Sequence, residues 1–172
     1  MARRTTTARV LVATAGLTLL GGCAPAVNVP PATDAADPVC GEVLQALPHV
    51  LADGERRSIT SQATAAWGEP AITLRCGVEP LGPTTERCLT VEADGSEVDW
   101  IALEGDDEAL PEHARQGQGT WVFLTYGRVP AIEVVVPVER AGDQPTGVLV
   151  DLARAVELAP ASRHCVGVTD VY

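Results

Sequence analysis

The spacing of apolar residues predicts a helix at the start of the folded part of the chain. Between residues 38 and 50 the apolar positions recur every three to four residues, as on one face of a helix. Asp37 and Pro38 stand in front of it as an N-cap and a first helical residue with a preset backbone angle. Pro48 breaks or kinks this helix. The apolar positions are Val39, Val43, Leu47 and Val50.

From about residue 71 the pattern changes to short alternating segments separated by turn residues, which is typical of strands. Asp94-Gly95 predicts a tight hairpin turn. The polar, acidic stretch 104–119 predicts a long surface loop. About five strands are predicted, at 71–76, in the two halves of 88–103, at 120–126 and at 131–138.

A second helix is predicted over 147–158, because its apolar residues share one side and Pro160 ends it. These residues are Leu149, Leu152, Ala153 and Val156. The element order therefore predicts an α+β fold, in which the N-terminal and C-terminal helices cover one face of an antiparallel sheet of about five strands.

The residues before Cys23 have the three zones of a secretion signal: a basic start with Arg3, Arg4 and Arg9, an apolar run, and two small residues. The apolar run, 10–20, is too short to span a bilayer, which needs about 20 residues. "LGGC", at 20–23, resembles a bacterial lipobox, in which the cysteine is lipidated and becomes residue one. The sequence thus predicts a lipoprotein signal peptide at 1–22 and lipid attachment at Cys23.

Two alternatives to the lipobox remain, a plain signal peptide and an uncut N-terminal anchor. Arg3-Arg4 also leaves the twin-arginine route open beside general secretion. After Cys23, the Pro- and Ala-rich stretch 23–37 lacks periodicity and predicts an extended, lipid-anchored tether. The remaining residues, 38–172, are the right number for a single domain.

The net charge of the chain limits the classes of molecule that it could bind. The chain has no lysine, and its 12 arginines against 23 acidic residues give a net charge of −11. Removal of residues 1–22 leaves nine arginines and a net charge of −14. This balance disfavours nucleic acid and anionic lipid headgroups as partners.

Four cysteines remain once Cys23 is set aside, and an even number in an exported segment predicts two disulfides. Cys76 ends one predicted strand and Cys88 opens the next, so a hairpin would pair Cys76 with Cys88. Cys40 and Cys165 would then pair and join the two ends of the domain. A metal site is the weaker interpretation, because no C-x-x-C occurs and the histidines are scattered.

Motifs for catalysis are missing from the chain. None of the serines after the signal lies in G-x-S-x-G, and no phosphate loop or H-E-x-x-H occurs. The segment 94–99 departs from a calcium loop and fits a hairpin turn better. The acidic run 104–108 could gather a divalent cation weakly, but a solvated loop explains it more simply. A glycosidase-like carboxylate pair is conceivable, yet nothing indicates which two would face each other.

Three arginines stand in apolar or turn segments: Arg75, Arg128 and Arg163. A buried guanidinium must meet a carboxylate or a ligand, because leaving it unpaired costs several kcal/mol. An internal ion pair explains these residues more simply. A contact with an anionic ligand is the alternative.

Several segments resemble a known family. "AWGEPAITLRCG", "RCLTV", "VDWIAL", "TYGRVPAIEVVVP" and "RHCV" are similar to an actinobacterial family of secreted or membrane-anchored proteins classed as domain of unknown function 3515. The resemblance extends from about Pro38 to Val166. It implies export, anchoring and the cysteine positions, and it carries no activity, ligand or catalytic residue.

Two functions from different classes follow. The first is a non-enzymatic envelope lipoprotein at the outer face of the cytoplasmic membrane, without a cofactor, that binds or supports an envelope partner. The second is a hydrolase, or a receptor for a solute or cell-wall precursor. A cavity of about 300 Å³ or more with convergent polar groups would favour the second. Shallow grooves with an exposed apolar patch would favour the first.

Overall fold

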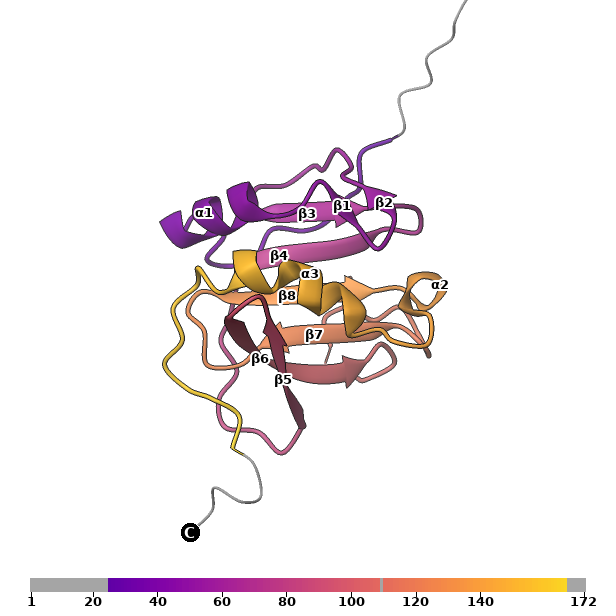
Figure 1. The fold of residues 1–172 in the computed structure, drawn as a ribbon. Coiled ribbons are helices and arrows are strands. Elements are labelled where there is room, and N and C mark those ends of the chain that lie inside the picture. Colours follow the sequence, from indigo (N-terminus) through magenta and orange to yellow (C-terminus); the bar gives the residue numbers. More distant parts are fainter. Residues whose placement is uncertain (1–24, 109, 167–172) are drawn as a thin grey trace, which may run out of the picture.

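The computed structural model describes residues 25–108 and 110–166, so the predicted signal peptide and Cys23 lie outside the described residues. The elements, shown in Figure 1, are α1 (Pro38–Ala46), β1 (Val50–Leu51), β2 (Gly54–Glu55), β3 (Thr64–Trp67), β4 (Ile72–Val78), β5 (Arg87–Ala93), β6 (Ser96–Glu104), β7 (Trp121–Thr125), β8 (Ala131–Val136), α2 (Val138–Ala141) and α3 (Gly147–Val156).

Six strands form one antiparallel sheet in the order β3-β4-β8-β7-β6-β5, and β1 and β2 form a separate two-stranded ribbon. The prediction of an α+β fold with an antiparallel sheet is confirmed. The sheet has one strand more than expected, because all four residues of β3 are buried and give no alternating pattern. The short helix α2 was not expected either.

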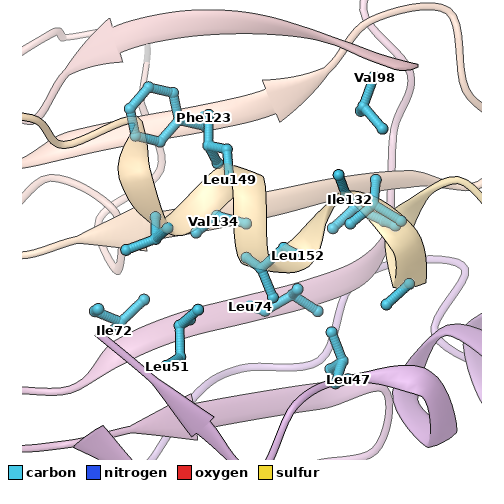
Figure 2. Packing of buried hydrophobic residues seen from close by; sticks show 14 of the residues in the cluster. Leu47, Leu51, Ile72, Leu74, Val98, Phe123, Ile132, Val134, Leu149 and Leu152 are labelled. Carbon is cyan, nitrogen blue, oxygen red and sulfur yellow. The ribbon is translucent and has the colours of Figure 1, made fainter. Parts of the chain in front are cut away.

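The main core lies between one face of the sheet and the helices α1 and α3. Helix α3 packs over β5 and β6 and against α1, and α1 also contacts β4. Figure 2 shows Leu149 and Leu152 of α3 among core side chains from the strands. Burial of each such leucine stabilises the fold by about 1.5–3 kcal/mol.

Helix α1 begins where the sequence predicts, at the N-cap Asp37 and the first helical residue Pro38. The Asp37 carboxylate accepts a hydrogen bond from the Val39 amide at 2.8 Å, and Pro38 is the first helical residue. The helix ends at Ala46, so the break expected at Pro48 is present and Val50 is not part of the helix. Val50 instead begins β1 and is 54% exposed.

Residues 105–108 and 110–120, here called the covering loop, lie on the other face of the sheet. The expectation of a purely surface loop is wrong, because Leu110 and Ala114 are buried against Val122 and Val135 of the sheet. Because most of their neighbours in the sequence are charged or polar, these two apolar residues give no clear core pattern. The loop therefore forms a second, smaller core.

Residues 25–37, here called the N-terminal strap, are packed on the domain. The Asp34 amide donates to the Gly77 carbonyl oxygen at 2.9 Å, and Val27 bridges to Ile59. Three strap residues are buried: Val29, Ala32 and Ala35. The predicted extended tether over 23–37 is therefore wrong for the described residues. Among the described residues the domain therefore includes the strap, because small apolar side chains of this Pro-rich stretch are buried.

The disulfides differ from the predicted pairs. Cys40 bonds to Cys76 with Cα atoms 5.5 Å apart, and Cys88 bonds to Cys165 with Cα atoms 5.9 Å apart. The predictions of Cys76 with Cys88 and of Cys40 with Cys165 are wrong. Strands β4 and β5 do not form a hairpin, because β8, β7 and β6 lie between them in the sheet. The first bridge joins α1 to β4, and the second joins the C-terminal segment to β5.

The predicted hairpin between 88 and 103 is present as β5 and β6. Asp94 and Gly95 both have positive φ, of 52° and 84°, as a tight two-residue turn requires. Within the described ranges, no helix has the length and apolar character needed to cross a membrane.

Candidate functional site

A cavity of about 360 Å³ opens beside the N-terminal strap. The strap residues 25–30 form one wall, the turn between β3 and β4 forms another, and the covering loop closes the third side with His113 and Gln116. We call it the strap cavity. Its polar side chains come from segments that are far apart in sequence: Asn28, Arg57, Glu69, Thr73, His113 and Gln116.

A buried charge cluster lies beside this cavity, on the sheet face opposite the helices. Arg75 and Glu133 are direct neighbours on β4 and β8, with 3.1 Å between Arg75 Nη1 and Glu133 Oε1. His113 Nε2 lies 2.9 Å from the same carboxylate oxygen. The side chain of Glu133 is only 4% exposed. The carboxylate therefore holds both the sheet arginine and the covering loop in place.

His113 is turned toward this cluster. Its Nε2 contacts both Glu133 and Arg75 Nη1, and its Nδ1 lies 3.4 Å from the same guanidinium nitrogen. A guanidinium donates protons and does not accept them. Both ring nitrogens contact the cluster, so the imidazole links the covering loop to the sheet. The cluster therefore positions the covering loop on the sheet.

Arg57 and Glu69 form an ion pair on the edge of the strap cavity. Arg57 also donates to the carbonyl oxygens of Gly68 at 3.1 Å and Pro25 at 2.9 Å. The second bond ties the strap to the strand edge. A second hollow, of about 830 Å³, shares Pro25, Arg57 and Glu69 with the strap cavity and lies on the side of the β1–β2 ribbon.

The three arginines singled out from the sequence lie in three different environments. Arg75 meets the internal carboxylate Glu133, which is the simpler of the two expectations. Arg128 is 5% exposed and donates to the carbonyl oxygens of Glu97, Glu157 and Ala159. Arg163 is exposed, so the expectation of apolar surroundings is wrong for it. The structure does not bring them together into one anion site.

Carbonyl oxygens, and not a carboxylate, are the direct partners of Arg128. Burial lowers the pKa of Arg128, and the nearby charges of Glu157, Asp99 and Glu97 act in the opposite direction. These contacts hold the turn between β7 and β8 against the end of α3. The role of Arg128 is therefore structural.

The structure also brings together Glu97, Asp99 and His164, whose ligand atoms all lie within 4.8 Å of one another. Asp99 already accepts hydrogen bonds from the Thr90 hydroxyl at 2.6 Å and the Cys165 amide at 3.0 Å. Arg128 donates to the Glu97 carbonyl oxygen, and its positive charge disfavours a cation nearby. The group ties the C-terminal segment to β6.

Sequence reasoning missed most residues of the strap cavity. Arg75 and Glu133 are each the single charged residue within an apolar strand, which marks both of them, but their pairing depends on the strand order. His113 and Gln116 give no comparable signal, because they stand in a polar loop. Asn28 and the strap were missed because their segment resembles a linker in composition.

Comparison with known proteins identifies a family without an assigned function. No curated protein and no solved structure matches the chain. One family pattern, described as "Protein of unknown function (DUF3515)", matches residues 8–164. This match includes the strap, the sheet and three of the four disulfide-bonded cysteines. Cys165 lies one residue beyond it. The chain belongs to the family of domain of unknown function 3515.

Proposed function

We propose that this protein is an envelope lipoprotein, anchored through Cys23 at the outer face of the cytoplasmic membrane, whose domain binds a small polar ligand without catalysing a reaction. The lipobox-like segment at 20–23 supports the anchor. The two disulfides support a location in an oxidising compartment, because such bonds persist there.

The strap cavity is the observation that carries the binding role. Its volume of about 360 Å³ lies within the range of small-molecule sites, roughly 300–1,000 Å³. Amide, hydroxyl and charged groups from the strap, β4 and the covering loop converge on it. Prolines on its border restrict the backbone, so little conformational entropy is lost when a ligand binds.

The contacts of His113 support binding over catalysis. Acid–base catalysis needs a group within hydrogen-bond reach of the reacting atom. Both ring nitrogens of His113 face the cluster of Arg75 and Glu133. No hydroxyl or thiol of the described residues forms a hydrogen bond with this imidazole.

The binding role is tested by filling the cavity. Ala71 lines it, and an Ala71→Trp variant would occupy much of its volume. The matched control is Ala46→Trp, at an exposed position on α1 that lines neither hollow. Native mass spectrometry of protein extracted from envelopes in mild detergent should detect a bound small molecule on the wild type and on the control only. Equal occupancy of Ala71→Trp, or no bound molecule on any form, would contradict the proposal.

A hydrolase is the second candidate, and the contact between His113 and Glu133 favours it, because a carboxylate that orients an imidazole is a common catalytic arrangement. This role requires His113 to turn toward the cavity. A His113→Asn variant that keeps the bound molecule but no longer converts it would support the hydrolase over the binding module.

A further inference from the structure

The hollow of about 830 Å³ beside the β1–β2 ribbon, here called the arginine hollow, gathers three of the nine arginines that follow the predicted signal peptide. Arg56 and Arg57 come from the segment after β2, and Arg140 comes from α2. Three carboxylates also line it: Asp53, Glu55 and Glu69. The charged lining is therefore balanced, in a chain that is otherwise strongly acidic.

Two of these arginines lack a carboxylate partner within the described part of the chain. Arg56 donates to the Leu44 carbonyl oxygen at 3.3 Å and lies over the Trp67 ring, with Cζ 5.7 Å from its centroid. Arg140 donates to the Ala52 carbonyl oxygen. A guanidinium carries five N–H donors, so each retains donors for a further group. Burial lowers the pKa of Arg56, which reflects its partial removal from water.

Arg140 lies against the backbone of the ribbon and of the β3–β4 turn. Its guanidinium lies directly against Gly54 and Gly68, where an added Cβ would come within 2.8 Å and 2.6 Å of its nitrogens. The absence of side chains at these two glycines leaves space for the guanidinium, which donates to the Ala52 carbonyl oxygen and so places a cation at this edge of the hollow.

The hollow is also close to the predicted anchor. Pro25 lines it and accepts a hydrogen bond from Arg57, and only one residue separates Pro25 from Cys23. Two residues of extended chain span at most about 7 Å. A lipid on Cys23 would therefore hold this hollow at the level of the phospholipid headgroups.

We propose that the arginine hollow binds the headgroup of a zwitterionic phospholipid. The phosphate lies against Arg56 and Arg140, and the ammonium lies near Glu55 and Glu69. An arginine matches a phosphate through paired N–H donors. The balanced lining favours a headgroup that carries both charges, whereas the net charge of −14 on residues 23–172 repels an anionic one. This inference rests on the proposed anchoring at Cys23.

The test uses the full chain carrying Cys23→Ser and soluble headgroups as probes. NMR titration compares glycerophosphoethanolamine, glycerophosphoglycerol, inorganic phosphate and ethanolamine. Glycerophosphoethanolamine should bind saturably, with a Kd on the order of 1 mM, and at least about fivefold more tightly than the other three. Absence of saturation would overturn the inference, and so would equal binding of inorganic phosphate.

Variants locate the site. Arg140→Gln and, independently, Arg56→Gln should weaken this binding about fivefold or more. The control, Arg154→Gln, makes the same change in charge at an exposed position on α3 and should bind as the parent does. Equal weakening by Arg154→Gln, or no effect of both hollow variants when each is folded by circular dichroism, would overturn the inference.

An experiment on bilayers separates the proposed anchoring at Cys23 from the proposed headgroup site. Lipidated wild type on vesicles of phosphatidylethanolamine and phosphatidylcholine should show slower hydrogen exchange at residues 53–57 than lipidated Arg140→Gln. If the chain proves not to be anchored through Cys23, the anchoring proposal fails, while the titration in solution or detergent still reports on the headgroup site. If anchoring holds and the titration fails, only the headgroup site is wrong.

Discussion

At the scale of single residues, buried charges are stabilised in two different ways. Glu133 meets Arg75 and His113, so a buried carboxylate is matched by a cation and by a ring that can donate. Arg128 has three carbonyl oxygens as its direct partners. In both cases the buried charge links segments that are distant in sequence.

Replacement of Glu133 with glutamine tests the charge cluster. The shape is kept, but Arg75 loses its carboxylate partner, so we expect a loss of about 3–5 kcal/mol in the free energy of unfolding. Urea denaturation followed by circular dichroism measures this loss. In the double variant Arg75→Met with Glu133→Leu, most of the stability should return, because no buried charge remains unpaired. A double variant as unstable as Glu133→Gln alone would contradict this account.

At the scale of elements, the sequence was informative where the cause is local. Asp37 and Pro38 start α1, and the Asp94-Gly95 turn sets the register between β5 and β6. These features depend on backbone angles and hydrogen bonds within a few residues. A reader of the sequence can therefore predict them without knowing the rest of the fold.

Strand order and the disulfides depend on distant segments, and there the sequence prediction failed. Cys76 and Cys88 are the nearest cysteines in the chain after the signal, yet their strands are separated by β8, β7 and β6. Burial of α3 against β5 and β6, and of α1 against β4, determines which cysteines meet. The strap cavity is hidden for the same reason, since its walls come from the strap, β4 and the covering loop.

The contact between the strap and β4 can be tested with two glycines of positive φ. Gly77 has a φ of 93°, and a Cβ there would lie 2.4 Å from the carbonyl carbon of Asp34. Gly95 has a φ of 84°, and nothing lies within 4 Å of its added Cβ. Replacement of Gly95 with alanine should cost about 1–2 kcal/mol of stability through backbone strain alone.

Replacement of Gly77 with alanine should cost clearly more, because the strap must also move. Thermal denaturation compares the two variants. Hydrogen exchange at the Asp34 amide, which donates to the Gly77 carbonyl oxygen, should speed up only in Gly77→Ala. If both variants lose the same stability and the Asp34 amide stays protected, the strap is not an integral part of the domain.

At the scale of the whole molecule, the described fold is independent of Cys23. All four other cysteines are used in the two disulfides, and the strap is held by backbone bonds and buried side chains from Pro25 onward. A lipid on Cys23, as proposed, would therefore serve to locate the protein and not to fold its domain. Two or more acyl chains, at about 0.8 kcal/mol per buried methylene, hold a domain firmly to a bilayer.

Replacement of Cys23 with serine should therefore release a folded protein from the membrane. After fractionation of the producing cells, wild type should be in the membrane pellet and Cys23→Ser in the soluble exported fraction. The thermal denaturation midpoint of the domain should be unchanged. Arg154→Gln, an exposed change on α3, is the control that should stay in the pellet. A Cys23→Ser protein that pellets as wild type does would contradict the lipid anchor, and one that fails to fold would mean that Cys23 contributes to the domain itself.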